Sequence, residues 1–297
     1  MGIIGQLKKY VAKRNECFIN VDLLEKTIIN SEEKKCIERK IKQLAERNYQ
    51  LAKSNVRGKI VGCHRLDNIV TLEYFLHYEF LMKSNRDCYH LEEQLQRRKA
   101  TFIDGELVRD EEFLNKDVQQ PPMIEREKKS RKQESRFVYD RREAVRYAER
   151  WWNDYHPHYK KFPNNCTNFV SQCLRAGGAP MAGYPHRSKG WWYQNDDWSY
   201  SWAVAHSFRW YLSGATSGLC GEEVGSPEDL LPGDVICYDF DGDGRFQHTA
   251  IVVAKDENNM PLVNAQTSNS RMRYWAYEDS TAWTPNIRYK FFRIVIL

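Results

Sequence analysis

Residues 164–174 read Asn-Asn-Cys-Thr-Asn-Phe-Val-Ser-Gln-Cys-Leu and predict a helix that begins at a cysteine. Apolar residues follow Cys166 at the spacing of one helical face. Asparagine is a common N-cap, and Gly177-Gly178 marks the helix end. The free N–H groups and the dipole at a helix start favour a thiolate, so Cys166 is a candidate nucleophile. On this helix alone, a buried structural cysteine is the simpler interpretation.

Length and composition favour a two-domain protein with well-formed cores. The chain has 297 residues, 41% of them hydrophobic, and a net charge of +5. This charge is spread along the chain apart from a dense basic run near 126–132, and we expect no nucleic-acid partner. We see neither a secretory signal nor an apolar run of the ~18 residues that a transmembrane helix needs, which favours a cytoplasmic location.

The cysteines do not indicate a disulfide framework or a metal site. The eight cysteines contain no C-x-x-C pair and no regular spacing, which is typical of reduced thiols. Asp239, Asp241 and Asp243 resemble the start of a calcium loop, but Ala250 stands where the final glutamate would be. We therefore predict a hairpin turn there. A zinc site from Cys166, Cys237 and His248 lacks a closely spaced ligand pair.

Residues 1–116 predict a small α+β domain without a catalytic cluster. Residues 1–54 read as helix, with a long amphipathic helix from Ser31 to Ala52 that ends at 55–58. Residues 68–83 predict a long antiparallel strand, and 101–108 a hairpin with an Asp-Gly turn. By architectural analogy this domain is of the cystatin or NTF2-like kind. We interpret His64, His77 and His90 as solvated or packed side chains.

A charged linker and a second domain follow. Residues 117–136 contain two prolines and a run of charged residues, which predicts a linker. In residues 137–297, helices are predicted from Asp140, Cys166 and Ser201, with loops over 179–200 and 214–225. Strands are predicted over 235–240, 246–253, 262–267 and 287–297.

The order of these elements places a nucleophile before a sheet that carries a histidine. His248 begins a strand, and Asn264 and Gln266 on the next strand have the same side-chain parity. Either amide could accept the imidazole N–H. A thiol on a helix end, an imidazole on a strand and a third polar group match a papain-like cysteine hydrolase of α+β class.

Several motifs resemble a known family. They are residues 139–145, the stretch Asn-Cys-Thr-Asn-Phe-Val-Ser-Gln-Cys at 165–173, Gly177-Gly178, and residues 232–235, 241–244 and 248–252. Together they resemble the putative amidase domain of Gram-positive bacteria, grouped with the NlpC and CHAP papain-like amidases, over about residues 137–297. The resemblance implies Cys166 as nucleophile and His248 as base. The family commonly has Asp where Asn165 stands and His where Gln266 stands.

The sequence therefore predicts a cysteine-dependent amide hydrolase that needs no cofactor. The backbone N–H of Cys166, with Asn164, Asn165 or Tyr159 nearby, would hold the oxyanion. Trp191 and Trp192 would line a groove for a peptide or peptidoglycan-type substrate of the cell wall. Without an export signal, a mother-cell or spore association is consistent with that substrate. The alternative is a catalytically weakened module for binding or scaffolding, which the residues at 165 and 266 favour.

Overall fold

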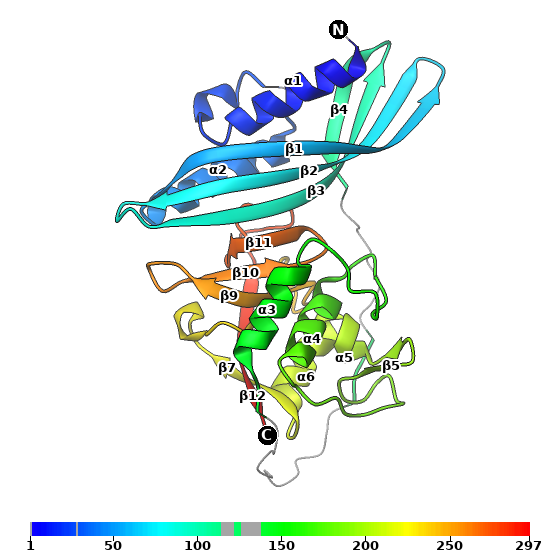
Figure 1. The fold of residues 1–297 in the computed structure, drawn as a ribbon, viewed down its shortest axis with the longest axis vertical. Coiled ribbons are helices and arrows are strands. Elements are labelled where there is room, and N and C mark those ends of the chain that lie inside the picture. Colours follow the sequence, from blue (N-terminus) through cyan, green and yellow to red (C-terminus); the bar gives the residue numbers. More distant parts are fainter. Residues whose placement is uncertain (1, 28, 114–121, 126–137) are drawn as a thin grey trace. The chain divides into compact units, whose positions relative to one another are not determined.

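The structure is a computed structural model that describes residues 2–27, 29–113, 122–125 and 138–297 (Figure 1). The chain forms two compact units. One comprises Met1–Asn115 with Ala276–Ala282, and the other comprises Lys116–Trp275 with Trp283–Leu297. Most of the predicted linker lies outside the described residues. No helix in the described ranges is long and apolar enough to cross a membrane.

The N-terminal unit combines two helices with an antiparallel meander. Its helices are α1 (Ile3–Glu16) and α2 (Ser31–Glu46), with a short 3-10 turn at Val21–Leu23 between them. Its strands pair in chain order: β1 (Tyr49–Leu66), β2 (Ile69–Ser84), β3 (Tyr89–Ile103) and β4 (Glu106–Glu112). Figure 1 shows β1, β2 and β3 as long strands lying side by side.

Strand β2 alternates between a buried and a half-buried face, as its sequence predicts. The buried face packs in one core with apolar residues of the helical segment, including Leu7, Phe18 and Ile37. The residues of that face are Val70, Leu72, Tyr74, Leu76, Tyr78, Phe80 and Met82. The predicted hairpin turn is also confirmed, because Asp104 and Gly105 both have positive φ, 52° and 84°.

The predicted helix to residue 52 is wrong at its C-terminal end. Helix α2 ends at Glu46, Asn48 turns the chain with φ 61°, and β1 begins at Tyr49. The strand then runs through the predicted stop at 55–58. Its pairing with β2 extends from Tyr49 opposite Ser84 to Leu66 opposite Ile69. This pairing outweighs the helical tendency of the charged sequence.

The C-terminal unit places helices against an antiparallel sheet. The helices are α3 (Arg141–Trp151), α4 (Cys166–Ala176), α5 (Tyr200–Ala203) and α6 (Ala205–Gly214). The strands are β7 (Leu219–Val224), β8 (Val235–Asp239), β9 (His248–Lys255), β10 (Pro261–Ala265), β11 (Asn269–Tyr274) and β12 (Arg288–Ile296). Their order across the sheet is β11-β10-β9-β8-β12-β7. A short hairpin, β5 (Tyr193–Gln194) with β6 (Asp197–Trp198), and a 3-10 turn at Pro227–Asp229 complete the unit.

Helix α4 is the central helix of this unit. Every residue from Cys166 to Leu174 is buried, and the helix ends before Gly177 as predicted. Its second residue meets the sheet, where Thr249 Oγ1 of β9 lies 3.2 Å from Thr167 Oγ1. Helix α3 begins as predicted, because the Asp140 carboxylate accepts hydrogen bonds from the N–H groups of Arg142 and Glu143.

Three other elements differ from the sequence prediction. The predicted loop at 214–225 contains β7, which pairs with the last strand, β12. The predicted strand 262–267 ends at Ala265, and β11 follows it. The predicted helix 201–212 is divided at Val204, whose backbone is extended. Short strands such as β7 depend on partners distant in sequence, which local patterns do not reveal.

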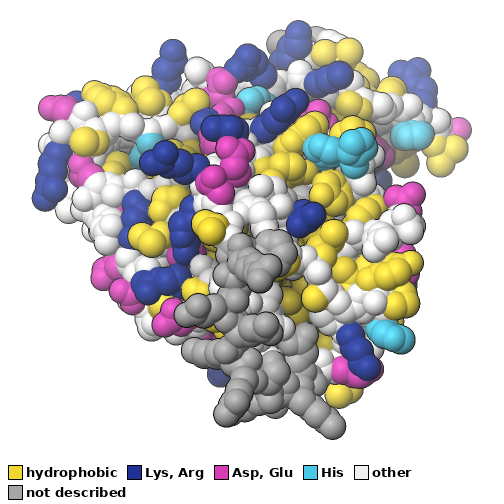
Figure 2. All heavy atoms as spheres, turned by 60° about the horizontal axis from the view of Figure 1, so that its bottom comes forward, with side chains coloured by type: hydrophobic (Ala, Val, Ile, Leu, Met, Phe, Trp, Pro, Cys, Tyr) yellow, Lys and Arg dark blue, Asp and Glu magenta, His cyan; other side chains and the backbone are white. Residues whose placement is uncertain are grey.

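The surface carries charges of both signs. On the face drawn in Figure 2, lysine and arginine side chains are interspersed with acidic and apolar ones. This distribution agrees with the small net charge of +5.

Candidate active site

Cys166 is the first residue of α4 and its side chain is buried. The residue is 4% exposed, and its Sγ lies 3.8 Å from Thr167 Oγ1. Two other cysteines of the unit, Cys173 and Cys237, are fully buried. Burial raises the pKa of Cys173 and of Cys237, which keeps both protonated near neutral pH. Cys173 therefore has the core role that its place on the helix face predicts.

The cap of α4 is not the predicted asparagine side chain. Asn165 precedes the helix, but its Oδ1 accepts from Phe162 N–H and Asn168 Nδ2 instead. The hydroxyl of Thr267, just after β10, replaces it. Thr267 Oγ1 accepts from the backbone N–H of Asn165 at 2.9 Å and of Cys166 at 3.2 Å. Thr267 holds this position with φ 89°, an unusual value for a β-branched residue.

A network of buried amides fixes the loop that leads to Cys166. Asn165 Nδ2 donates to Gln266 Oε1 at 2.5 Å, and Gln266 Nε2 donates to the carbonyls of Trp151 and Asp154. Asn168 continues the network by accepting from Trp202 Nε1 at 2.8 Å. Asn165 and Gln266 thus contact each other directly. Neither side chain can ionise.

His248 begins β9 in a buried aromatic environment. It lies opposite Tyr238 on β8, and their ring centroids are 5.4 Å apart. Phe240 stacks at 6.1 Å. Burial, with a smaller contribution from the positive charge of Arg273, lowers the pKa of His248 to about 3. The imidazole is therefore neutral over the physiological pH range.

The structure brings the segments of the two predicted catalytic residues together. The contact between Thr167 and Thr249 lies one residue away from both Cys166 and His248. Side chains alternate along a strand, so the imidazole of His248 faces the opposite side of the sheet from Thr249. The pairing of Cys166 with His248 stays a prediction.

Asn264 and Gln266 both face α3, in agreement with their equal parity. Asn264 Nδ2 donates to Glu149 Oε1 at 2.8 Å, and its Oδ1 accepts from Met272 N–H at 2.8 Å. The acceptor oxygen of Gln266 is engaged by Asn165. An orienting role for either amide would require these hydrogen bonds to be exchanged for one from His248.

The indoles of Trp191 and Trp192 belong to the core, which argues against the predicted substrate groove. They are 0% and 1% exposed. Trp191 Nε1 donates to Ser171 Oγ on α4 at 2.9 Å, and Trp192 Nε1 donates to the carbonyls of His186 and Lys189. Burial with satisfied N–H groups is what large indoles adopt in a core. Their spacing in an aromatic loop gave no signal that separates these two roles.

The turn after β8 is a hairpin turn. Both carboxylate oxygens of Asp239 accept backbone hydrogen bonds, from Gly242 and Gly244 at 2.8 Å each. This carboxylate therefore stabilises the turn. In the described ranges, His77, Glu79 and Glu93 of the N-terminal unit have ligand atoms within 4.8 Å of one another. Arg57 pairs with Glu79, and His77 with Glu93, which accounts for this group without a cation.

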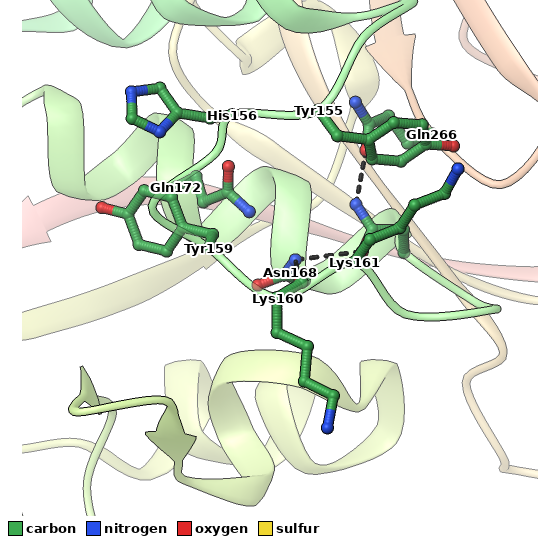
Figure 3. Close-up of a pocket in the computed structure, with 9 residues that line it drawn as sticks. Tyr155, His156, Tyr159, Lys160, Lys161, Asn168, Gln172 and Gln266 are labelled. Atoms are coloured by element: carbon green, nitrogen blue, oxygen red, sulfur yellow. Dashed lines mark hydrogen bonds between the residues drawn. The ribbon is translucent and has the colours of Figure 1, made fainter.

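A shallow pocket opens beside the N-terminal half of α4 (Figure 3). It includes Asn165 and Tyr159, two of the residues predicted for oxyanion or substrate contacts. Asn164, also predicted, is half-buried and is not among the lining residues. Gln266, predicted as a partner of His248, also lines the pocket. Sequence reasoning missed the remaining lining residues because they come from a loop and from α4, which no local pattern brings together. The lining residues are Tyr155, His156, Tyr159, Lys160, Lys161, Asn165, Asn168, Gln172 and Gln266.

Comparison with known proteins identifies the family. The model of the putative amidase domain matches residues 138–292, about half of the chain. The chain belongs to the putative amidase domain family. This family suggests amide hydrolysis, and its match covers α3, α4 and the sheet up to β12.

Relatives in Bacillus subtilis (strain 168) resemble the chain to different extents. The uncharacterized protein YhbB is 50% identical over 268 residues, which cover 88% of this chain and 86% of YhbB. That match extends well beyond the family domain. The uncharacterized protein YjcM is 33% identical over 138 residues, 43% of this chain and 31% of YjcM. No solved structure matches the chain.

Proposed function

We propose that the C-terminal unit hydrolyses an amide bond, with Cys166 as nucleophile and His248 as general base. The observation that carries this proposal is the place of Cys166 at the first position of α4, in a chain of the putative amidase domain family. Backbone N–H groups and the helix dipole stabilise a thiolate at that position. A peptide or peptidoglycan-type amide is the substrate we propose.

The proposed reaction follows the papain-like pattern. His248 accepts the proton of the Cys166 thiol, and the thiolate so formed attacks the amide carbonyl. The backbone N–H of Cys166 donates to the developing oxyanion. That N–H now donates to the Thr267 hydroxyl, so the substrate oxygen would take the place of the hydroxyl. The imidazolium of His248 protonates the leaving amine, and water then releases the acyl group from sulfur. The pKa of about 3 leaves the imidazole neutral but makes it a weak base, so proton transfer to His248 requires that the negative charge of the Cys166 thiolate stabilise the imidazolium.

The test combines a substrate panel with matched variants. The purified chain is incubated with peptidoglycan fragments and small peptide amides, beside Cys166→Ala and His248→Ala, and products are identified by mass spectrometry. We expect hydrolysis only by the unmodified chain. Hydrolysis by Cys166→Ala at the unmodified rate would refute the nucleophile assignment.

Thiol labelling provides a second measurement that needs no substrate. Iodoacetamide should label Cys166 faster than Cys220 or Cys237 near neutral pH, and labelling should slow in His248→Ala. Equal labelling of these thiols in the native chain would contradict an activated Cys166.

A binding or scaffolding module is the second candidate. The observation that favours it is the hydrogen bond between Asn165 and Gln266, because it places two amides where the family commonly has an ionisable pair. If this second candidate is right, the unmodified chain and Cys166→Ala should bind wall peptide equally, and neither should hydrolyse it.

A further inference from the structure

We propose that Thr267 keeps the candidate active site in a latent state, because its hydroxyl occupies the place of the substrate carbonyl oxygen and must leave before an amide can react. We call the contact of this hydroxyl with the backbone N–H groups of Asn165 and Cys166 the Thr267 latch. The latch concerns the regulation of the site proposed above and rests on that proposal for Cys166 as the nucleophile.

Two adjacent backbone N–H groups converge on the Thr267 hydroxyl. The N–H of Asn165 donates to Oγ1 at 2.9 Å, and the N–H of Cys166 donates to the same oxygen at 3.2 Å. An oxyanion hole has this form, with two donors about 2.7–3.1 Å from one oxygen. The N–H of Asn165 is therefore the second oxyanion donor beside that of Cys166, and the hydroxyl already engages both donors in the free chain.

The reactive side chains are buried, whereas the side chain that engages the two donors is exposed. Cys166 is 4% exposed and His248 is 8% exposed. Thr267, by contrast, belongs to the exposed residues of the chain. A substrate that approaches from solvent therefore reaches Thr267 first. When a substrate oxygen replaces the hydroxyl, both N–H groups keep an acceptor, so no buried donor is left unsatisfied.

The backbone on both sides of Thr267 is held, so the side chain is the part that moves. Gln266 is buried, and its Nε2 donates to the carbonyls of Trp151 and Asp154. Strand β11 begins at Asn269, two residues after Thr267. Release of the latch then needs only a rotation of χ1 from one staggered well to another. In one of the other wells the Cβ hydrogen takes the place of the hydroxyl, which leaves room for an oxygen.

The conformation of Thr267 agrees with a role in the reaction. Its φ of 89° is an outlier for a β-branched residue. Conformations of this kind cost free energy and cluster at active sites and switch regions, where the surrounding structure holds them. The chain thus retains a strained threonine at the position where a hydroxyl meets the two oxyanion donors.

The test compares two probes of Cys166 in the full chain. With N-acetyl-alaninal, a small aldehyde, Sγ bonds to the aldehyde carbon, the C=O π bond opens and His248 takes the thiol proton. The aldehyde oxygen becomes an oxyanion that needs the two donors. Methyl methanethiosulfonate transfers its methylthio group to the thiol and releases methanesulfinate, and it forms no such oxyanion. NMR measures the affinity for the aldehyde, with Cys166→Ala as the background.

Removal of the hydroxyl should favour the aldehyde selectively. We expect Thr267→Ala to bind the aldehyde about fivefold more tightly, because the oxyanion no longer competes with the hydroxyl for two hydrogen bonds. The rate with methyl methanethiosulfonate should change by less than about twofold. Thr267→Ser, which keeps the hydroxyl, should restore the original affinity. Ser226→Ala is the matched control, because it removes the hydroxyl that caps the 3-10 turn Pro227–Asp229 of the same unit.

A hydroxyl that only caps the helix gives a different result. Its loss would fray the start of α4, which weakens binding of the aldehyde or accelerates both probes together. Either result, or an unchanged aldehyde affinity in Thr267→Ala, would overturn the latch. Absence of aldehyde binding by every variant would overturn it as well, because no oxygen would then replace the hydroxyl.

The outcome also separates the latch from the hydrolase proposal. Tighter aldehyde binding by Thr267→Ala, in a chain that cleaves no amide, supports the latch and removes the hydrolase function. Hydrolysis that depends on Cys166, with an aldehyde affinity that does not respond to Thr267→Ala, does the opposite.

Discussion

Asn165 and Gln266 form one hydrogen-bonded unit at the start of α4. The resemblance noted in the sequence implies an Asp and a His at these two positions, and the 2.5 Å contact between the side chains makes substitutions at the two positions dependent on each other. An aspartate facing a histidine here would form a charge-assisted pair, whereas two amides form a neutral hydrogen bond.

We therefore predict that Asn165→Asp with Gln266→His increases the reactivity of Cys166. The double variant restores a carboxylate–imidazole pair next to the thiol, and an imidazolium there stabilises the thiolate. The rate of iodoacetamide labelling at pH 6–7 should rise by about tenfold, whereas each single change leaves an unmatched partner and should give less than half of that gain. Additive single effects would contradict this coupling.

His248 makes stability depend on pH. Its pKa is about 3 in the folded chain, against about 6.5 in an unfolded one. Between these values the unfolded state binds the extra proton, so the free energy of unfolding falls as pH falls. The expected slope from this residue is up to about 1.4 kcal/mol per pH unit.

Urea unfolding at several pH values checks this expectation. His248→Asn should lose less stability than the unmodified chain on going from neutral pH to pH 4. Parallel pH profiles for the two proteins would show that His248 is solvated or protonated in the folded state.

The predictability of single residues depended on how local their environment is. Cys166 follows from its own helix, since the spacing of its neighbours gives both its position and its burial. The Thr267 cap does not, because its partner N–H groups lie about a hundred residues earlier in the chain. Equal parity correctly placed Asn264 and Gln266 on one side, but their partners Glu149 and Asn165 come from other segments.

The N-terminal cap of α4 is the hydroxyl of Thr267, just after β10. Replacing Thr267 with Ala removes the acceptor of two backbone N–H groups, and we expect a loss of about 1 kcal/mol in the free energy of unfolding. Hydrogen exchange at the Asn165 and Cys166 amides should accelerate. Thr267→Ser is the control and should retain both properties. Unchanged exchange in Thr267→Ala would mean that the hydroxyl is not the cap.

Elements with one buried face were predictable, and those defined by distant pairing were not. Strand β2 shows the alternation directly in its sequence, and β12 has enough apolar residues to be recognised. The predicted boundary between α2 and β1 was wrong because the few apolar residues of 47–58 are scattered among polar and charged ones, so no clear period marks the change from helix to strand. Strands β7 and β11 are six residues each and pair with segments whose position the local sequence does not contain.

The N-terminal unit includes a segment from the C-terminal part of the chain. Residues Ala276–Ala282 belong to it, although the family match at 138–292 spans them. Lys40 Nζ lies 2.7 Å from Glu92 Oε1 and 3.0 Å from Asp279 Oδ2, with all three side chains less than 10% exposed. Arg39 donates to the carbonyl oxygens of Glu278 and Ser280.

We predict that Lys40→Met strongly destabilises the N-terminal unit. The change leaves two buried carboxylates without their cation, a situation that costs about 3 kcal/mol or more. Urea unfolding gives the free energy, and limited proteolysis should show cleavage within 276–282. Lys42→Met is the matched control on the same helix, because Lys42 is 75% exposed and its ion pair with Glu46 is at the surface, and should change stability by less than about 0.5 kcal/mol. Similar effects of the two substitutions would show that the ion pairs of Lys40 do not fix residues 276–282 in the N-terminal unit.

The order of synthesis determines when residues 276–282 can join the N-terminal unit. A ribosome makes the N-terminal unit first, and early domains commonly fold before later ones exist. Here Lys40 meets Glu92 early, but Asp279 is made only after residues 116–275 of the other unit. The N-terminal unit, although it is made first, is therefore completed only after residues 116–275 have been made. A chain truncated before residue 276 would carry a complete sequence for α1 to β4 and still lack part of the unit they form.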